Sequence, residues 1–200
     1  MDIHITNDKN IVNEIVDIHM ATFQGFFLTF LGKGFLKQLY EGYIEHKQSN
    51  LIVARQNKEI VGFIAYSSDI SDLYKYLIKK KLLLFAWYSF IAFIKNPKIL
   101  FRLLSAFSKS EEVSRKEKYI ELASIGVKPN VKAQGIGSSM ISYMKELIDF
   151  NEYEYISLET DAENNEYANK FYLKNGFVLI RTYETKQGRK MNEYRYFHRN

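Results

Sequence analysis

The turn VKPNVKAQGIGSSMI, residues 127–141, contains residue types suited to holding an anion. Gly135 and Gly137 lie one residue apart, after a strand-like run and before a helix-like run. A helix start offers free backbone N–H groups and the positive end of the helix dipole, and glycine lets a ligand approach them closely. Lys132 adds a cation and Ser138 a hydroxyl. The turn therefore favours a pyrophosphate site, with tight packing as an equally good explanation of the two glycines taken alone.

Two familiar phosphate-binding motifs do not fit this turn. A P-loop ends in Gly-Lys-Ser/Thr, which is missing here. A dinucleotide-binding fingerprint needs a third glycine and a preceding strand–helix alternation, and the sequence has neither. The turn alone therefore does not identify the molecule that carries the phosphate.

The elements around the turn follow from hydrophobic periodicity and from caps and turn residues. We predict strands at residues 2–6, 51–55, 60–66, 118–127, 153–160, 177–185 and 192–199, and helices at 11–22, 35–46, 135–150 and 164–176. This order indicates one α/β (α+β) domain over residues 1–200, with a sheet of mixed direction and one right-handed crossover through the helix at 136–150.

An insertion at about residues 70–116 interrupts this order between the third and fourth strands. Residues 82–94, LLLFAWYSFIAFI, are nearly all apolar and follow three lysines at 79–81. The apolar run is shorter than the ~20 residues that span a bilayer. Asn96-Pro97 is typical of a new helix start, so we predict a pair of inserted helices.

Positive charge is concentrated around the insertion. Residues 73–120 carry eleven Lys or Arg against three Glu, a net of +8, whereas the whole chain is +5 and the remainder is therefore −3. An acidic remainder disfavours nucleic acid as a partner. Three roles stay open for residues 73–110: packing in a homodimer or in the core, contact with an anionic membrane, or a wall of the substrate pocket.

Composition limits the chemistry further. There is no cysteine, so a disulfide or a thiol nucleophile is excluded, and no His pair or carboxylate cluster has metal-ligand spacing. We therefore expect no metal. The polar start MDIHITNDKN does not have the pattern of a signal peptide. We expect a cytoplasmic protein, with association at the inner face of the membrane as an alternative.

Two sequence blocks together resemble those of one enzyme family. Val127 and Pro129 precede Lys132-Ala133-Gln134-Gly135-Ile136-Gly137, and Asn165-x-x-Ala168-x-x-Phe171-Tyr172-x-x-x-Gly176-Phe177 follows in the next helix. The first block resembles the acyl-CoA signature of the GNAT superfamily of N-acetyltransferases, Gln/Arg-x-x-Gly-x-Gly/Ala after Val-x-Pro, and the second resembles the family's pattern on its next helix. Lysine stands where Arg or Gln is usual, which keeps the charge but loses the bidentate fork.

The resemblance implies a mostly antiparallel twisted sheet and acetyl-CoA as the acyl donor. It implies that the strand carrying Ile125 to Val127 splays from the next strand, and that the pantetheine arm fills the gap and pairs with that backbone. The N–H groups of Lys132 to Ser138 would hold the pyrophosphate. The cofactor-binding residues implied in this way are Ile125, Gly126, Val127, Lys132, Ala133, Gln134, Gly135, Ile136, Gly137, Ser138, Asn165, Ala168 and Phe171.

Attack of a neutral amine on a thioester needs a base, donors for the developing oxyanion and an acid for the leaving thiolate. Tyr172 matches the family tyrosine that acts as the acid, with an ordinary half-buried aromatic as the alternative. The N–H near Ile125 is the expected oxyanion donor. Glu121 has the spacing at which some members of the family place a catalytic glutamate, and on an ideal strand it shares a face with Ile125 and Val127. A solvated carboxylate, with a water chain as the base, is the alternative.

The acceptor is less well defined by the sequence. His19 and Asp161 are weaker candidates for the base, because one suits packing and the other turn chemistry. The aromatic stretch FQGFFLTFLGKGF, residues 23–35, either lines an acceptor pocket or folds onto the core. We expect a small-molecule amine, with an amino sugar or a nucleotide-linked amino sugar as candidates. The alternative is a non-catalytic CoA-binding or membrane-surface module with the same fold.

Overall fold

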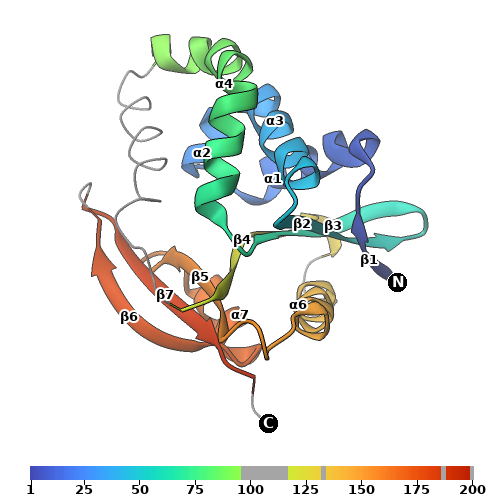
Figure 1. Cartoon of the computed structure of the whole chain (residues 1–200), viewed down its shortest axis with the longest axis vertical. Helices are drawn as coiled ribbons and strands as arrows, with labels where there is room; N and C mark the ends of the chain where they lie inside the picture. Colours follow the sequence, from blue (N-terminus) through green and yellow to red (C-terminus); the bar gives the residue numbers. More distant parts are fainter. Residues whose placement is uncertain (96–116, 132–133, 186–187, 199–200) are drawn as a thin grey trace.

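The computed structural model describes residues 1–95, 117–131, 134–185 and 188–198. The described strands form one seven-stranded sheet in the order β1-β2-β3-β4-β5-β7-β6 (Figure 1). Their bounds are β1 (Asp2–Thr6), β2 (Ser49–Gln56), β3 (Glu59–Ser67), β4 (Tyr119–Val127), β5 (Tyr155–Asp161), β6 (Val178–Glu184) and β7 (Lys190–Tyr196). Only β4 and β5 pair in parallel, and the other neighbours are antiparallel. The predicted mixed, mostly antiparallel sheet is therefore confirmed.

Helices cover both faces of the sheet (Figure 1). They are α1 (Val12–Thr22), α2 (Phe27–Phe30), α3 (Gly32–Glu45), α4 (Ile70–Lys95), α6 (Ile136–Leu147) and α7 (Glu166–Lys174), with the short 3₁₀ helices η1 (Lys9–Ile11) and η2 (Pro129–Val131). Side chains alternate along a strand, so Phe63 and Ala65 of β3 join a core with α1, α3 and α4. Ile64 and Tyr66 join a second core with α6 and α7.

The helix α3 begins earlier than the sequence predicted. We expected it at residues 35–46 after a glycine-rich loop, but it runs from Gly32 to Glu45, and the short α2 lies within the loop. Gly34 lies against the ring of Tyr88 from α4, and a side chain there would overlap that ring. Gly34 therefore permits close helix packing, whereas Gly25 and Gly32 have the positive φ values typical of turns.

The insertion between β3 and β4 begins with one long helix. α4 continues through the whole apolar run to Lys95, and the predicted second helix at Asn96-Pro97 lies outside the described residues. α4 packs on α3 through Leu73, Leu77 and Phe85, which are buried. Among the described helices, none is long and apolar enough to cross a membrane.

Candidate functional site

Strands β4 and β5 diverge after three paired residues. Their parallel pairing joins Tyr119–Glu121 only to Tyr155–Ser157. Beyond that point β4 stays paired with β3 up to Val127, and β5 stays paired with β7 up to Asp161. The divergence, visible in Figure 1, leaves one edge of β4 without a strand neighbour in the described chain, as the resemblance implied.

The N-terminus of α6 lies directly after β4 and the short η2 helix. Gly135, its N-cap residue, has φ +78°, and no side chain of the described residues caps the helix. The first N–H groups of a helix have no intrahelical acceptor, so those of Ile136, Gly137 and Ser138 are available to a ligand. Lys132 and Ala133, which the resemblance assigns to the same site, lie outside the described residues.

The two glycines of the turn are required for different reasons. A Cβ on Gly135 would meet no described atom within 4 Å, so glycine is needed there for the left-handed backbone. A Cβ on Gly137 would lie 3.1 Å from Cε2 of Phe171 and 3.8 Å from Cγ2 of Val127. The expectation of room for a ligand thus suits Gly135, whereas Gly137 makes room for Phe171 of α7.

The other turn and strand residues serve the core or face solvent. Ile136 is buried among the residues of the α6 core, Gln134 is exposed and Ser138 is half-buried. A Cβ on Gly126 would lie 2.7 Å from the ring of Phe63, on the α1 side of β4. These residues can therefore contribute backbone groups more readily than side chains.

Tyr172 of α7 is packed in an aromatic cluster. It is 8% exposed, and its ring centroid lies 5.4 Å from that of Phe171 and 5.9 Å from those of Phe177 and Tyr194. Burial raises the pKa of Tyr172 well above its ordinary value, so its hydroxyl is protonated at neutral pH. Through Phe171 the same helix reaches the start of α6, and the two sequence blocks are therefore neighbours in space.

α7 is tied to the ends of β5 and β7 by asparagine side chains. Asn165 is the N-cap residue of α7, but its side chain does not cap the helix; its Nδ2 donates to Oγ1 of Thr160 at 2.7 Å. Asn169 donates to the carbonyl of Asp161 at 2.9 Å and accepts from the hydroxyl of Tyr194 at 2.8 Å. Asn169 was missed, although an asparagine inside a helix is itself a signal of a specific hydrogen bond. Ala168, which the resemblance assigns to cofactor binding, lies between these two asparagines in the sequence and packs against the α6 core.

A β-bulge interrupts β4. Ser124 pairs with Ala65 and Leu122 pairs with Tyr66, which leaves Ala123 as an extra residue. Because side chains alternate with a period of two, one extra residue transfers the following side chains to the other face of the sheet. The ideal alternation assumed from the sequence therefore fails at Ala123.

The bulge changes the surroundings of Glu121. Ile125 and Val127 pack against the α6 and α7 core. Glu121 instead interacts electrostatically with Tyr43 of α3 and Tyr74 of α4, on the opposite face. The prediction that Glu121 shares a face with Ile125 and Val127 is wrong, because it assumed a regular strand.

Carboxylates and tyrosines gather on this opposite face where β4 and β5 diverge. Burial raises the pKa of Tyr74, and the charges of Glu121 and Glu159 raise it further. Burial also raises the pKa of Tyr43, and Glu121 adds to the effect. Glu159 and Tyr74 were not predicted. A single carboxylate within the apolar strand YISLET was the only sequence signal for Glu159, and Tyr74 lies in the insertion, which matches no motif.

A buried polar chain leads from α1 to the bulged part of β4. Nδ1 of His19 lies 2.6 Å from the hydroxyl of Tyr40, and Tyr40 also hydrogen-bonds to the side chain of Ser124. Burial lowers the pKa of His19 to about 4, so the imidazole is neutral at neutral pH. His19 therefore holds Tyr40 in place and is poorly suited to be the base. Its Nε2 is buried and has no hydrogen-bond partner among the residues that the structure describes.

Asp161, the other weak candidate, is held in an ion pair. Its Oδ1 accepts from Nη2 of Arg189 at 2.7 Å and from Nε at 2.9 Å, which joins the end of β5 to the β6–β7 hairpin. Within the ranges that the structure describes, no three His, Asp or Glu side chains are grouped so that they could hold a metal ion.

Solved structures with the same fold include several acetyltransferases. The chain is 14% identical to aminoglycoside 6'-acetyltransferase type Ii, with 100% of each chain covered and a TM-score of 0.64. It is 14% identical to ribosomal-protein-alanine N-acetyltransferase from Brucella melitensis, with 99% and 100% covered and a TM-score of 0.62. A protein from Bacillus anthracis str. Ames, described as a streptothricin acetyltransferase and solved with acetyl coenzyme A, is 18% identical, with 80% and 68% covered and a TM-score of 0.52.

At these identities the structures establish the shared fold alone. No curated protein matches the sequence significantly. The model of the Acetyltransferase (GNAT) family matches residues 12–177, which is most of the chain and includes both sequence blocks. The chain therefore belongs to the GNAT family of acetyltransferases.

Proposed function

We propose that the protein transfers an acetyl group from acetyl-CoA, the acyl donor of its family, to the primary amine of a small molecule by direct attack in a ternary complex. The observation that carries this proposal is the gap between β4 and β5 beside the uncapped N-terminus of α6. An open strand edge and free helix N–H groups suit the two halves of a CoA molecule, namely an extended amide-containing arm and a pyrophosphate.

The donor would lie along the open edge of β4. The pantetheine arm carries amide groups and can add to the backbone of Ile125 and Val127 as a strand adds to a sheet edge. The N–H groups of Ile136 to Ser138 would bind the pyrophosphate, with Gly135 giving the turn its left-handed backbone. Phe171 packs behind the turn, and Asn165 acts through Thr160.

Tyr172 would be the acid. In the reaction the amine nitrogen forms a bond to the acetyl carbon, the carbon–sulfur bond breaks, and the thiolate takes a proton from the Tyr172 hydroxyl. The hydroxyl is protonated at neutral pH because burial raises its pKa. The backbone N–H near Ile125 would donate to the oxyanion.

Glu121 would take the proton from the amine, directly or through one water. The bulge at Ala123 supports this role, because it turns Glu121 away from the cofactor gap and toward α3 and α4. An acceptor entering from that side would meet the carboxylate at the point where the two strands separate. Ser124, hydrogen-bonded to Tyr40, lies between Glu121 and Ile125 and would position the acceptor.

The acceptor that suits this face best is a cationic amine. Glu121 and Glu159 both act electrostatically on Tyr74, so two carboxylates contribute negative charge around this tyrosine. Carboxylates attract ammonium groups and repel phosphates. A polyamine or an amino sugar with several amino groups therefore fits this face better than a nucleotide-linked amino sugar.

A binding experiment and a turnover experiment test the proposal together. Thermal-shift titrations with acetyl-CoA, CoA and ATP should show stabilisation by both CoA species at concentrations where ATP has no effect. Thiol release should then be measured over polyamines, aminoglycosides and nucleotide-linked amino sugars, and we expect release with the first two classes. Absence of a shift with either CoA species would refute donor binding, and release only with the nucleotide-linked class would refute the acceptor assignment.

A further inference from the structure

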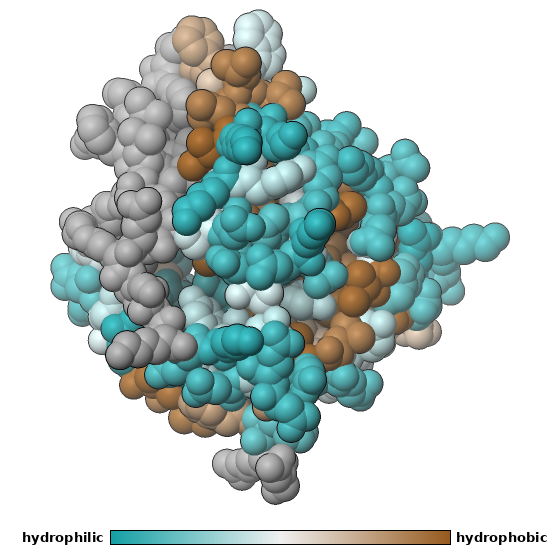
Figure 2. All heavy atoms as spheres, in the orientation of Figure 1, coloured by the Kyte–Doolittle hydropathy of each residue, from teal (hydrophilic) through white to brown (hydrophobic). Residues whose placement is uncertain are grey.

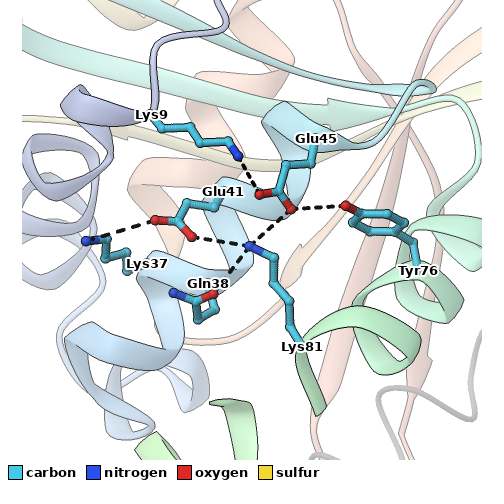
Figure 3. Close-up of polar contacts among 7 residues, drawn as sticks. All are labelled: Lys9, Lys37, Gln38, Glu41, Glu45, Tyr76 and Lys81. Atoms are coloured by element: carbon cyan, nitrogen blue, oxygen red, sulfur yellow. Dashed lines mark hydrogen bonds and ion pairs between the residues drawn. The ribbon is translucent and has the colours of Figure 1, made fainter. Parts of the chain in front are cut away.

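Within the described chain, α4 packs on α3 through one side, and the buried Lys81 lies on that side. Nζ of Lys81 lies 3.1 Å from Oε2 of Glu45, 3.2 Å from Oε2 of Glu41 and 3.3 Å from Oε1 of Gln38 (Figure 3). Lys81 thus points toward α3, although its neighbours Lys79 and Lys80 in the sequence are exposed.

The same network fixes the rotation of α4 about its axis. Glu45 also accepts from Nζ of Lys9 at 2.7 Å and from the hydroxyl of Tyr76 at 3.1 Å (Figure 3). Burial raises the pKa of Glu45, but hydrogen bonds from Lys9 and Lys81 lower it more, so the carboxylate stays charged. Turning α4 would leave buried charges unpaired, which is strongly unfavourable. The outward side of α4 is therefore well defined.

The outward side of α4 is apolar over its later turns. Leu83 is 85% exposed and Trp87 is 76% exposed. Figure 2 shows apolar surface gathered where α4 reaches the top of the molecule. The exposed large apolar side chains of the outer α4 surface are Leu82, Leu83, Leu84, Trp87 and Phe90. An exposed apolar patch of this kind marks an interaction surface.

Positive charge borders the outer α4 surface. Lys75, Lys79 and Lys80 are exposed on the turns just before it. From Leu73 to Lys95 the helix has no Asp or Glu. The surface thus combines a cationic border with Leu, Phe and Trp side chains, two features that suit contact with an anionic bilayer.

We propose that the outer α4 surface, together with Lys75, Lys79 and Lys80, binds the surface of an anionic lipid bilayer. The lysines would contact anionic headgroups, and the apolar side chains would enter the boundary between headgroups and acyl chains, where Trp is favoured. A second copy of the chain is a poorer occupant. In a two-fold contact the same surface appears on both sides, and this surface offers the lysines no acid.

The chain supplies its own probe for this contact, because Trp87 is its only tryptophan. The full chain should be titrated with vesicles of phosphatidylcholine alone and with vesicles containing equal phosphatidylglycerol and phosphatidylcholine. With the anionic vesicles we expect a shift of the emission to shorter wavelength, quenching by brominated acyl chains and co-sedimentation, all weakened by added salt. Absence of both the shift and the co-sedimentation would overturn the proposal. A shift that grows with protein concentration without vesicles would assign the surface to a second copy.

Charge and apolar variants test the two parts of the surface separately. Lys79→Glu and Lys80→Glu should each weaken co-sedimentation with the anionic vesicles by about tenfold. Leu83→Glu should do the same, and because Leu83 is so exposed the thermal stability should not change. Lys47→Glu makes the same charge change at an exposed lysine outside α4 and should bind as the unmodified chain does. Equal loss in Lys47→Glu would show that net charge alone controls binding and would refute a defined surface.

Discussion

The two faces of the sheet assemble their parts of the proposed active site in different ways. On the α6 and α7 face, the residues assigned to the donor come from two contiguous blocks, residues 125–138 and 165–172. On the α1, α3 and α4 face, the residues assigned to the acceptor come one or two at a time from separate elements, among them Tyr43, Tyr74 and Glu159.

The difference follows from what each face has to recognise. A pyrophosphate and an extended arm can be bound by backbone groups, which a turn, a helix start and a strand edge supply wherever the chain takes those conformations. A particular amine has to be distinguished by side chains, and these must be gathered from distant parts of the chain. Donor binding can therefore be encoded locally, whereas acceptor binding depends on tertiary packing.

The largest effect is expected on the donor face. Tyr172→Phe should lower kcat by about a thousandfold, because the leaving thiolate loses its acid. The Kd for acetyl-CoA from calorimetry should stay unchanged. Tyr167→Phe removes a hydroxyl from an exposed residue of the same helix and serves as the control. A Tyr172→Phe variant with normal kcat would leave Tyr172 as a packing residue only.

Because His19 is buried, we expect the stability of the fold to depend on pH. The pKa of His19 is about 4 in the folded protein and about 6.5 when unfolded, so the unfolded state binds the proton more readily. The contribution of the neutral His19 to the free energy of unfolding is fully present above pH 6.5. It is lost as the pH falls toward 4, a decrease of about 3 kcal/mol.

Denaturant unfolding at several pH values checks this effect. The free energy of unfolding of His19→Gln should fall less steeply between pH 6.5 and 4 than that of the unmodified chain. His4→Gln, at a partly exposed histidine of β1, controls for the general effect of losing an imidazole. Equal slopes in the His19 variant and the unmodified chain would mean that His19 is accessible to protons in the fold.

Substitutions of Glu121 and Glu159 test catalysis and binding of the amine separately. Glu121→Gln should lower kcat by about a hundredfold if Glu121 takes the proton. Glu159→Gln should mainly raise KM for a cationic amine. Neither variant should change the Kd for acetyl-CoA, since both carboxylates act on Tyr74 of α4, whereas the groups proposed to bind the donor are backbone groups of β4 and α6. If Glu121→Gln keeps its kcat, a water chain is the base.

The smallest effects are expected for alanine substitutions of Gly135 and Gly137, and they distinguish the roles of the two glycines. Gly135→Ala forces alanine into the left-handed region and should lower the free energy of unfolding by about 1 kcal/mol, with a matching loss of acetyl-CoA affinity. Gly137→Ala keeps its backbone and needs only a shift of the Phe171 ring, so its effect should be smaller. The reverse order would show that Gly137, and not Gly135, controls the shape of the turn.

Much of the donor face could be predicted from the sequence. The order of strands and helices, the turn before α6 and the position of Tyr172 all depend on residues close together in the chain. Local conformation is set by short-range sterics and hydrogen bonding, so a motif such as Gly135-x-Gly137 keeps its geometry in the fold. At Gly137 the structure supports the alternative of tight packing, because Phe171 approaches it from another helix.

The acceptor face was decided by tertiary structure. The bulge at Ala123 depends on how β4 pairs with β3, and it places Glu121 on the face opposite Ile125 and Val127. Lys81 turns inward while Lys79 and Lys80 face solvent, because α3 places Glu41 and Glu45 opposite only one of them. The sequence by itself determined which residues could do the chemistry. Only pairing and packing between distant elements decided which of them meet, because register and helix rotation are set by contacts that no local pattern contains.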